Sequence, residues 1–196
     1  MISTLLRQHT AGLHARVERV VDVPARCRSL ASYRQLLARL LGLYAPLERE
    51  LAWVDWAAVG IEFGPRRKAD WLRADLRALA LTPAQIGALP ACASVPRLPS
   101  PAAAVGCLYV LEGATLGGQI MAPAIQASLA IEPATGGSFY AGYGASTRTM
   151  WRSYCDAANQ FCADDPAKVA DALASAAATF EAFLAWLEPE QPAGQR

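Results

Sequence analysis

One histidine of this chain has a hydroxyl and a carboxylate at helical spacing on either side of it. In the stretch LLRQHTAGLHARVE, Thr10 precedes His14 by four residues and Glu18 follows it by four. On an α-helix these positions share a face, so the glutamate can hold one ring N–H while the other nitrogen binds a metal. The same spacing also suits an exposed Glu–His pair with no ligand. Because His9 is the only other histidine, sites with several histidine ligands are hard to build.

A second unusual feature is a group of glycines inside an apolar stretch, GCLYVLEGATLGGQIMAP. Each glycine within a helix costs roughly 0.5 to 1 kcal/mol relative to alanine, so a compensating interaction is expected. Gly106, Gly113 and Gly117 fall within roughly 40° of one another around a helix and leave a bare backbone face, flanked by Gly118. That face suits either close packing of another helix or a flat ligand such as a macrocycle. A histidine held by a carboxylate one turn away also has the geometry that a haem iron requires of an axial ligand.

Apolar residues recur at helical spacing along nearly the whole chain. No segment alternates apolar and polar residues for long enough to indicate a strand, so the sequence predicts an all-α fold. One domain is expected over residues 1–188, followed by a flexible tail over 189–196. Helices are expected over residues 5–21, 29–54, 65–80, 101–129, 146–162 and 165–188, with a helical turn over 82–89.

Prolines and glycines punctuate this pattern. Ser29 is expected to cap the second helix and Pro46 to bend it. The third helix is expected to carry Pro65 in its first turn. Four prolines within residues 89–101 predict a surface loop, and the glycine-rich residues 133–146 interrupt the helical pattern.

The composition excludes several classes of protein. With 196 residues, 54% of them hydrophobic, and a net charge of +1, the chain can build one core but offers no basic surface for nucleic acid or an anionic membrane. Its five cysteines are scattered without ligand spacing, which argues against disulfide or zinc frameworks. The first residues do not form a secretory signal, and the longest apolar run is interrupted by Glu112. We therefore expect a cytoplasmic protein that does not enter a membrane.

Taken together, the two motifs resemble those of the heme oxygenase family. LLRQHTAGLHARVE is similar to its proximal helix, and LYVLEGATLGG resembles the distal helix of bacterial, biliverdin-producing members, especially those associated with bacteriophytochromes. The likeness extends through SYRQLLARLLGLYAPLE, RKADWLRADLRAL, FYAGYGASTRTMWRSY and AAATFEAFLAWL, so it covers most of the chain in order.

The resemblance implies a single-domain, multi-helical fold with haem between the first helix and a kinked, glycine-rich distal helix. Haem would be both cofactor and substrate, cleaved at a meso carbon to biliverdin, carbon monoxide and ferrous iron with O2 and an external reductant. His14 would be the iron ligand and, with Gly113 and Gly117, catalytic. The remaining haem contacts implied are Arg7, Thr10, Glu18, Tyr109, Ala114, Gly118, Arg148 and Arg152, the arginines serving the propionates.

Two positions depart from the family pattern. Ala114 stands where mammalian relatives carry an aspartate that organises water, so water would be held by the backbone, Thr115 or more distant groups. Glu112 is turned about 100° from the bare face and is not expected to be catalytic. Arg148 stands where a glycine is expected, which affects the mouth of the pocket.

The chain carries no GxGxxG fingerprint, so the resemblance implies that electrons come from a ferredoxin, flavodoxin or reductase docked near Arg7, Arg148 and Arg152. A bacteriophytochrome is a candidate acceptor for the bilin. Three alternatives remain open at this stage: a non-catalytic haem- or bilin-binding protein of the same fold, a helical enzyme of the thiaminase-like fold, and an interaction module without a ligand.

Overall fold

The computed structural model describes residues 1–188, and every regular element in that part of the chain is helical. The predicted all-α class is confirmed. The elements in order are α1 (Ile2–Val21), α2 (Val23–Arg26), α3 (Leu30–Leu51), α4 (Trp56–Val59), η1 (Gly64–Arg66), α5 (Ala69–Ala78), α6 (Pro83–Gly87), α7 (Pro101–Leu129), η2 (Pro133–Thr135), α8 (Ser138–Ala141), η3 (Gly144–Ser146), α9 (Thr147–Phe161) and α10 (Pro166–Leu187).

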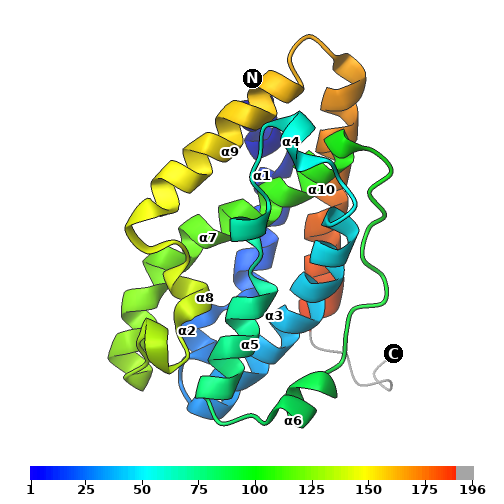
Figure 1. Ribbon diagram of the computed structural model, residues 1–196. Helices are drawn as coiled ribbons and strands as arrows, with labels where there is room; N and C mark the ends of the chain where they lie inside the picture. Colours follow the sequence, from blue (N-terminus) through cyan, green and yellow to red (C-terminus); the bar gives the residue numbers. More distant parts are fainter. Residues whose placement is uncertain (189–196) are drawn as a thin grey trace, which may run out of the picture.

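The centre of the molecule is the long helix α7 packed along α10. Helix α1 lies on α10, α9 covers part of α7, and α3 packs against α5 on the other side of the core (Figure 1). The axis of α7 turns downward in its second half, where its later glycines and Pro123 lie (Figure 1). The core between these helices is apolar, with Tyr33, Tyr44 and Tyr154 among its largest fully buried side chains.

The long helices begin where side chains can satisfy their free backbone N–H groups. Ser29 accepts a hydrogen bond from the backbone N–H of Ser32 at 3.1 Å, as its predicted capping role requires. Ser100 caps α7 in the same way, with Pro101 at the first helical position. Asp165 caps α10. These local signals explain why the predicted starts of the three helices agree with the structure.

The prediction of one helix over residues 65–80 is wrong at its start. Pro65 lies in η1, and the extended backbone of Arg67 (φ −76°, ψ 127°) separates that turn from α5. Arg66 and Lys68 are both buried against Glu112. Residues two apart point the same way in an extended segment but about 200° apart on a helix, so a continuous helix could not bury both cations together.

The other segments agree more closely with expectation. The predicted helix over 101–129 matches α7 at both ends, and the predicted turn over 82–89 contains α6. The glycine-rich residues 133–146 do interrupt the pattern, as short turns of helix in η2, α8 and η3. All five cysteines are free, and four of them are buried. The tail predicted over 189–196 lies outside the described residues.

Two helices, α7 and α10, are long and apolar enough for a membrane span by length and composition alone. The same composition is typical of core helices, and these two pack against each other at the centre of the molecule. Within their apolar windows 56% and 44% of the residues are buried, so each helix has a second, less covered side. On α7 that side carries the glycines of the candidate site.

Candidate functional site

Helix α1 is covered by protein only in its first half. Ile2, Leu6 and Thr10 are buried, whereas no residue from 11 to 21 is. That second half nevertheless carries several apolar side chains that pack only partly against the core: Leu13, Val17, Val20 and Val21. An apolar helix face left partly uncovered is suited to an apolar ligand.

His14 lies on this uncovered half of α1. Its side chain is 54% exposed, and its Nδ1 lies 3.7 Å from a carboxylate oxygen of Glu18. The ring packs edge-on against Phe180 of α10, with centroids 5.8 Å apart. Because the carboxylate lies on the Nδ1 side, Nε2 is the ring nitrogen available to a metal. The structure therefore brings His14 and Glu18 together as their spacing predicted.

Thr10 and Tyr109 are both enclosed by the protein. Thr10 is 1% exposed and donates to the carbonyl of Leu6 at 2.8 Å, so it does not line open space. Tyr109 of α7 is also buried, and its ring lies 5.6 Å from that of Trp151. Burial raises the pKa of the Tyr109 phenol, against the opposing effect of a hydrogen bond with Thr10. Haem contacts at these two residues therefore stay a proposal.

The pKa of Tyr109 responds to Thr10, so these side chains of α7 and α1 lie near each other. Both helices descend from the upper part of the molecule in Figure 1. One turn further along α1 is His14, and one turn further along α7 is Gly113. His14 and Gly113 therefore each follow, by one helical turn, a member of the neighbouring pair Thr10 and Tyr109.

The glycines of α7 divide into two kinds. A methyl group added at Gly117 would meet no described atom within 4 Å, and one at Gly113 would meet only the Trp151 ring at 4.0 Å. At Gly106 it would lie 2.0 Å from the carbonyl oxygen of Ala172, and at Gly118 it would lie 3.2 Å from that of Tyr140.

The predicted bare face is therefore real at Gly113 and Gly117 and wrong at Gly106 and Gly118. Gly106 lets α10 approach α7 closely, and Gly118 does the same for α8. Helical spacing shows on which side of the helix each glycine lies. It cannot show whether the backbone of another helix already occupies the space on that side.

The positions between these glycines provide few polar groups. Ala114 is exposed, as a residue lining an opening would be. Thr115, expected to help hold water, is 4% exposed and donates its hydroxyl to the carbonyl of Leu111 at 3.2 Å. This hydroxyl is enclosed and already donates within α7, so only its lone pairs remain for water.

The three arginines proposed for anionic groups are all exposed. Arg7 is on α1 near Tyr109, while Arg148 and Arg152 are one turn apart on α9 and flank Trp151. Within residues 1–188, none of the three lies within 4.0 Å of a carboxylate. They are available to carboxylates of a ligand or to an acidic partner.

Sequence reasoning missed a buried ion cluster next to this opening. Glu112, immediately before Gly113, accepts hydrogen bonds from Arg66, from Lys68 at 2.6 Å and from the hydroxyl of Tyr143 at 2.7 Å. Burial lowers the pKa of Lys68, against the opposing charge of Glu112. The available signal was a lone carboxylate inside an otherwise apolar helix, because a buried charge requires a partner of opposite charge.

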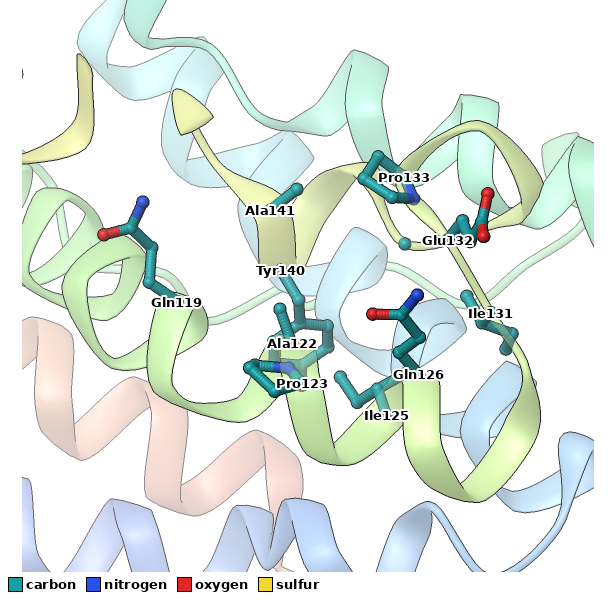
Figure 2. A pocket seen from close by; sticks show the side chains of 11 residues that line it. Gln119, Ala122, Pro123, Ile125, Gln126, Ile131, Glu132, Pro133, Tyr140 and Ala141 are labelled. Carbon is teal, nitrogen blue, oxygen red and sulfur yellow. The ribbon is translucent and has the colours of Figure 1, made fainter. Parts of the chain in front are cut away.

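A separate pocket of about 370 Å³ lies beside the second half of α7 (Figure 2). Gln119, Pro123 and Gln126 border it from α7, and residues from Ile131 to Ala141 close the other side. None of the residues predicted for the functional site lines it. It is therefore not the opening beside His14.

The donor set around His14 fits a ligand that carries its own metal. In residues 1–188 no group of three or more His, Cys, Asp or Glu side chains could hold a metal ion. A haem supplies four of the iron ligands itself and needs only an axial imidazole from the protein. The open backbone at Gly113 and Gly117 is a surface that a Cβ atom would fill.

Comparison with known proteins agrees with this fit. The family model described as heme oxygenase matches residues 1–189, nearly the whole chain. No curated protein matches the chain at a significant level.

Proposed function

The chain belongs to the heme oxygenase family, and from this premise we propose that it binds haem between α1 and the middle of α7 and cleaves it to biliverdin, carbon monoxide and ferrous iron. Membership of the family supports haem as the ligand and haem degradation as the activity in general. The observation that carries the proposal is the open backbone of Gly113 and Gly117, where an added methyl group would have no described neighbour closer than 4.0 Å.

On the proximal side, the imidazole of His14 would hold the iron through Nε2. Glu18 would keep Nδ1 protonated and the ring in one tautomer, and Phe180 would limit its rotation. A neutral imidazole is a suitable ligand, because a thiolate would favour early cleavage of the O–O bond. Bound haem would supply both the iron at which O2 is reduced and the meso carbon that is oxidised.

On the distal side, Gly113 and Gly117 would let the main chain approach the macrocycle closely. No side chain at these positions can push a diatomic ligand away from the plane of the ring. Ala114 is exposed and Thr115 is bonded elsewhere, so the protons of the reaction would come from water that enters through the open edge. Such a site directs the reaction by shape more than by polar side chains.

The exposed arginines define the rest of the proposal. Arg7 and the Arg148–Arg152 pair would bind the propionates or present a positive surface to an acidic ferredoxin, flavodoxin or reductase. A cytoplasmic location, and delivery of the bilin to a bacteriophytochrome, are parts of the same proposal. The alternative is a haem- or bilin-binding protein without turnover, favoured by the lack of a polar side chain at Ala114.

The test is a titration with hemin followed by addition of a reductant in the presence of catalase. His9 is the matched control for His14, since both are exposed on α1 but five residues apart, so they point about 140° away from each other. Wild type and His9→Ala should show the same Soret band and form biliverdin, and His14→Ala should lose both. A stable haem spectrum without any bilin would establish the binding protein instead, and an unchanged spectrum in His14→Ala would contradict ligation by this residue.

A further inference from the structure

The buried ion cluster beside the opening links three separate segments of the chain. Arg66, from η1, is 4% exposed and donates to Glu112 of α7. The same guanidinium donates to the carbonyl of Met150 at 3.1 Å and to the hydroxyl of Ser153 at 2.8 Å, both on α9. Lys68 reaches Glu112 from the same side as Arg66. One side chain, Arg66, therefore holds α7 and α9 at once.

The two points that Arg66 holds are next to the open stretch of α7. Glu112 directly precedes Gly113, and Met150 directly precedes Trp151. The Trp151 ring is the only described group within 4.0 Å of a methyl group placed at Gly113. A change in the separation of α7 and α9 at the cluster would therefore change the space beside Gly113.

Stability alone is a poor explanation for this cluster. Moving charges out of water costs several kcal/mol per ion, and well-packed apolar residues often replace buried ion pairs without loss of stability. The cluster also leaves the buried Nε of Arg66 without a hydrogen-bond partner. The hydrogen bonds of Arg66 do fix the relative positions of its acceptors, because a planar guanidinium donates in a few defined directions.

We propose that Arg66 is a positioning residue of the haem cleft, which sets the distance between α7 and α9 beside Gly113 and so the fit of the macrocycle. The inference rests on the proposed function, but its structural part concerns the ligand-free protein as well. Arg66 acts through Glu112, Met150 and Ser153, and it does not itself touch the ligand.

The decisive variant is Arg66→Lys, because it separates charge from geometry. A lysine keeps the buried positive charge opposite Glu112, but one ammonium cannot also reach both acceptors on α9. Ser153→Ala removes a single bond of the same link. Ile86→Ala is the control for lost stability, since Ile86 is a buried residue of α6, which lies at the far end of the molecule from α9 (Figure 1).

Hydrogen exchange and hemin affinity are both measured on the full-length chain. Hydrogen exchange of the ligand-free protein should become faster within residues 113–119 and 147–153 in Arg66→Lys, and less so in Ser153→Ala. Hemin affinity should fall about tenfold in Arg66→Lys, as for other residues that orient a ligand indirectly, and roughly threefold in Ser153→Ala. The biliverdin isomers formed by Arg66→Lys should also change in proportion, which a purely structural role would not cause.

The proposal is overturned if Arg66→Lys keeps wild-type exchange in both segments and a hemin Kd within about twofold of wild type. It is also overturned if Ile86→Ala, at an equal loss of melting temperature, reproduces both effects. Should wild type fail to bind hemin, the proposed function fails, while the exchange of residues 113–119 still decides whether Arg66 positions α7.

Discussion

The two halves of α7 are built for opposite purposes. From Ala102 to Glu112 every residue is buried, and this half is surrounded by other helices. From Gly113 onward exposed positions alternate with covered ones, and Ala114, Gly117 and Ile120 are open to solvent. The helix is continuous across the boundary, so one element serves as core in its first half and as a candidate ligand surface in its second.

Glycine shows this difference most clearly, because the same residue type serves both purposes. Gly106 permits two helix backbones to touch, whereas Gly117 faces space that no described atom fills. The spacing of these residues is helical in both cases and does not distinguish them. A glycine in a helix therefore indicates that another group approaches the backbone closely. Only the surroundings of the glycine show whether that group is another helix or a ligand.

The strongest test of the packed half is Gly106→Ala. The added methyl group would lie 2.0 Å from the Ala172 carbonyl oxygen and 2.9 Å from its Cα atom, so α10 itself would have to move. We expect a loss of at least about 3 kcal/mol in the free energy of unfolding, measured by denaturant titration. Gly12→Ala is the control, since that glycine is also in a helix but has no described neighbour within 4 Å. An equal response of both variants would contradict the difference in packing.

The boundary between the halves is tested by Glu112→Gln. The amide keeps the shape of the side chain but removes the carboxylate that Arg66 and Lys68 both contact. We expect a loss of about 2 kcal/mol in the free energy of unfolding. Glu18→Gln removes a carboxylate that is 68% exposed and should change the melting temperature little. A Glu112→Gln protein as stable as wild type would show that the cluster does not depend on the negative charge of Glu112.

Local features of the structure could be predicted well from the sequence, and contacts between residues far apart in the chain could be predicted poorly. Periodicity and capping residues such as Ser29 and Asp165 are local, so the long helices and the all-α class could be predicted. His14 and Glu18 are one turn apart on one helix, and their contact follows from that spacing alone. Gly106 and Gly118 could not be interpreted correctly, because their neighbours are 66 and 22 residues away in the chain.

The buried cluster escaped prediction for the same reason. Its bonds join residues 66 and 112, and residues 66 and 153, which no periodicity relates. The two cations were assigned to the first turn of a helix because Pro65 directly precedes them in the sequence. A carboxylate in the middle of the apolar run before Gly113 was the only local sign that cations must come from elsewhere.

Within the second half, Gly118→Ala tests whether the packing use of glycine continues past the opening. Its methyl group would lie 3.2 Å from the Tyr140 carbonyl oxygen, a contact that requires a shift of a few tenths of an ångström. We expect a loss of about 1 kcal/mol in the free energy of unfolding, less than for Gly106→Ala. Thermal unfolding of the two variants side by side measures the order. A larger loss at Gly118 than at Gly106 would reverse the assignment of core and surface along α7.

The smallest expected effect on folding, and the one of opposite sign, belongs to Gly117→Ala. No described atom opposes the methyl group, and alanine is the better helix former, so the ligand-free protein should gain about 0.5 to 1 kcal/mol in the free energy of unfolding. The same methyl group would occupy the space proposed for the macrocycle, and hemin affinity should fall about tenfold or more. Unfolding without hemin and titration with hemin, on one preparation, give both numbers. A gain in stability with unchanged hemin affinity would show that the face at Gly117 is open but that haem binds elsewhere. A haem lying against this backbone could not tolerate the added methyl group.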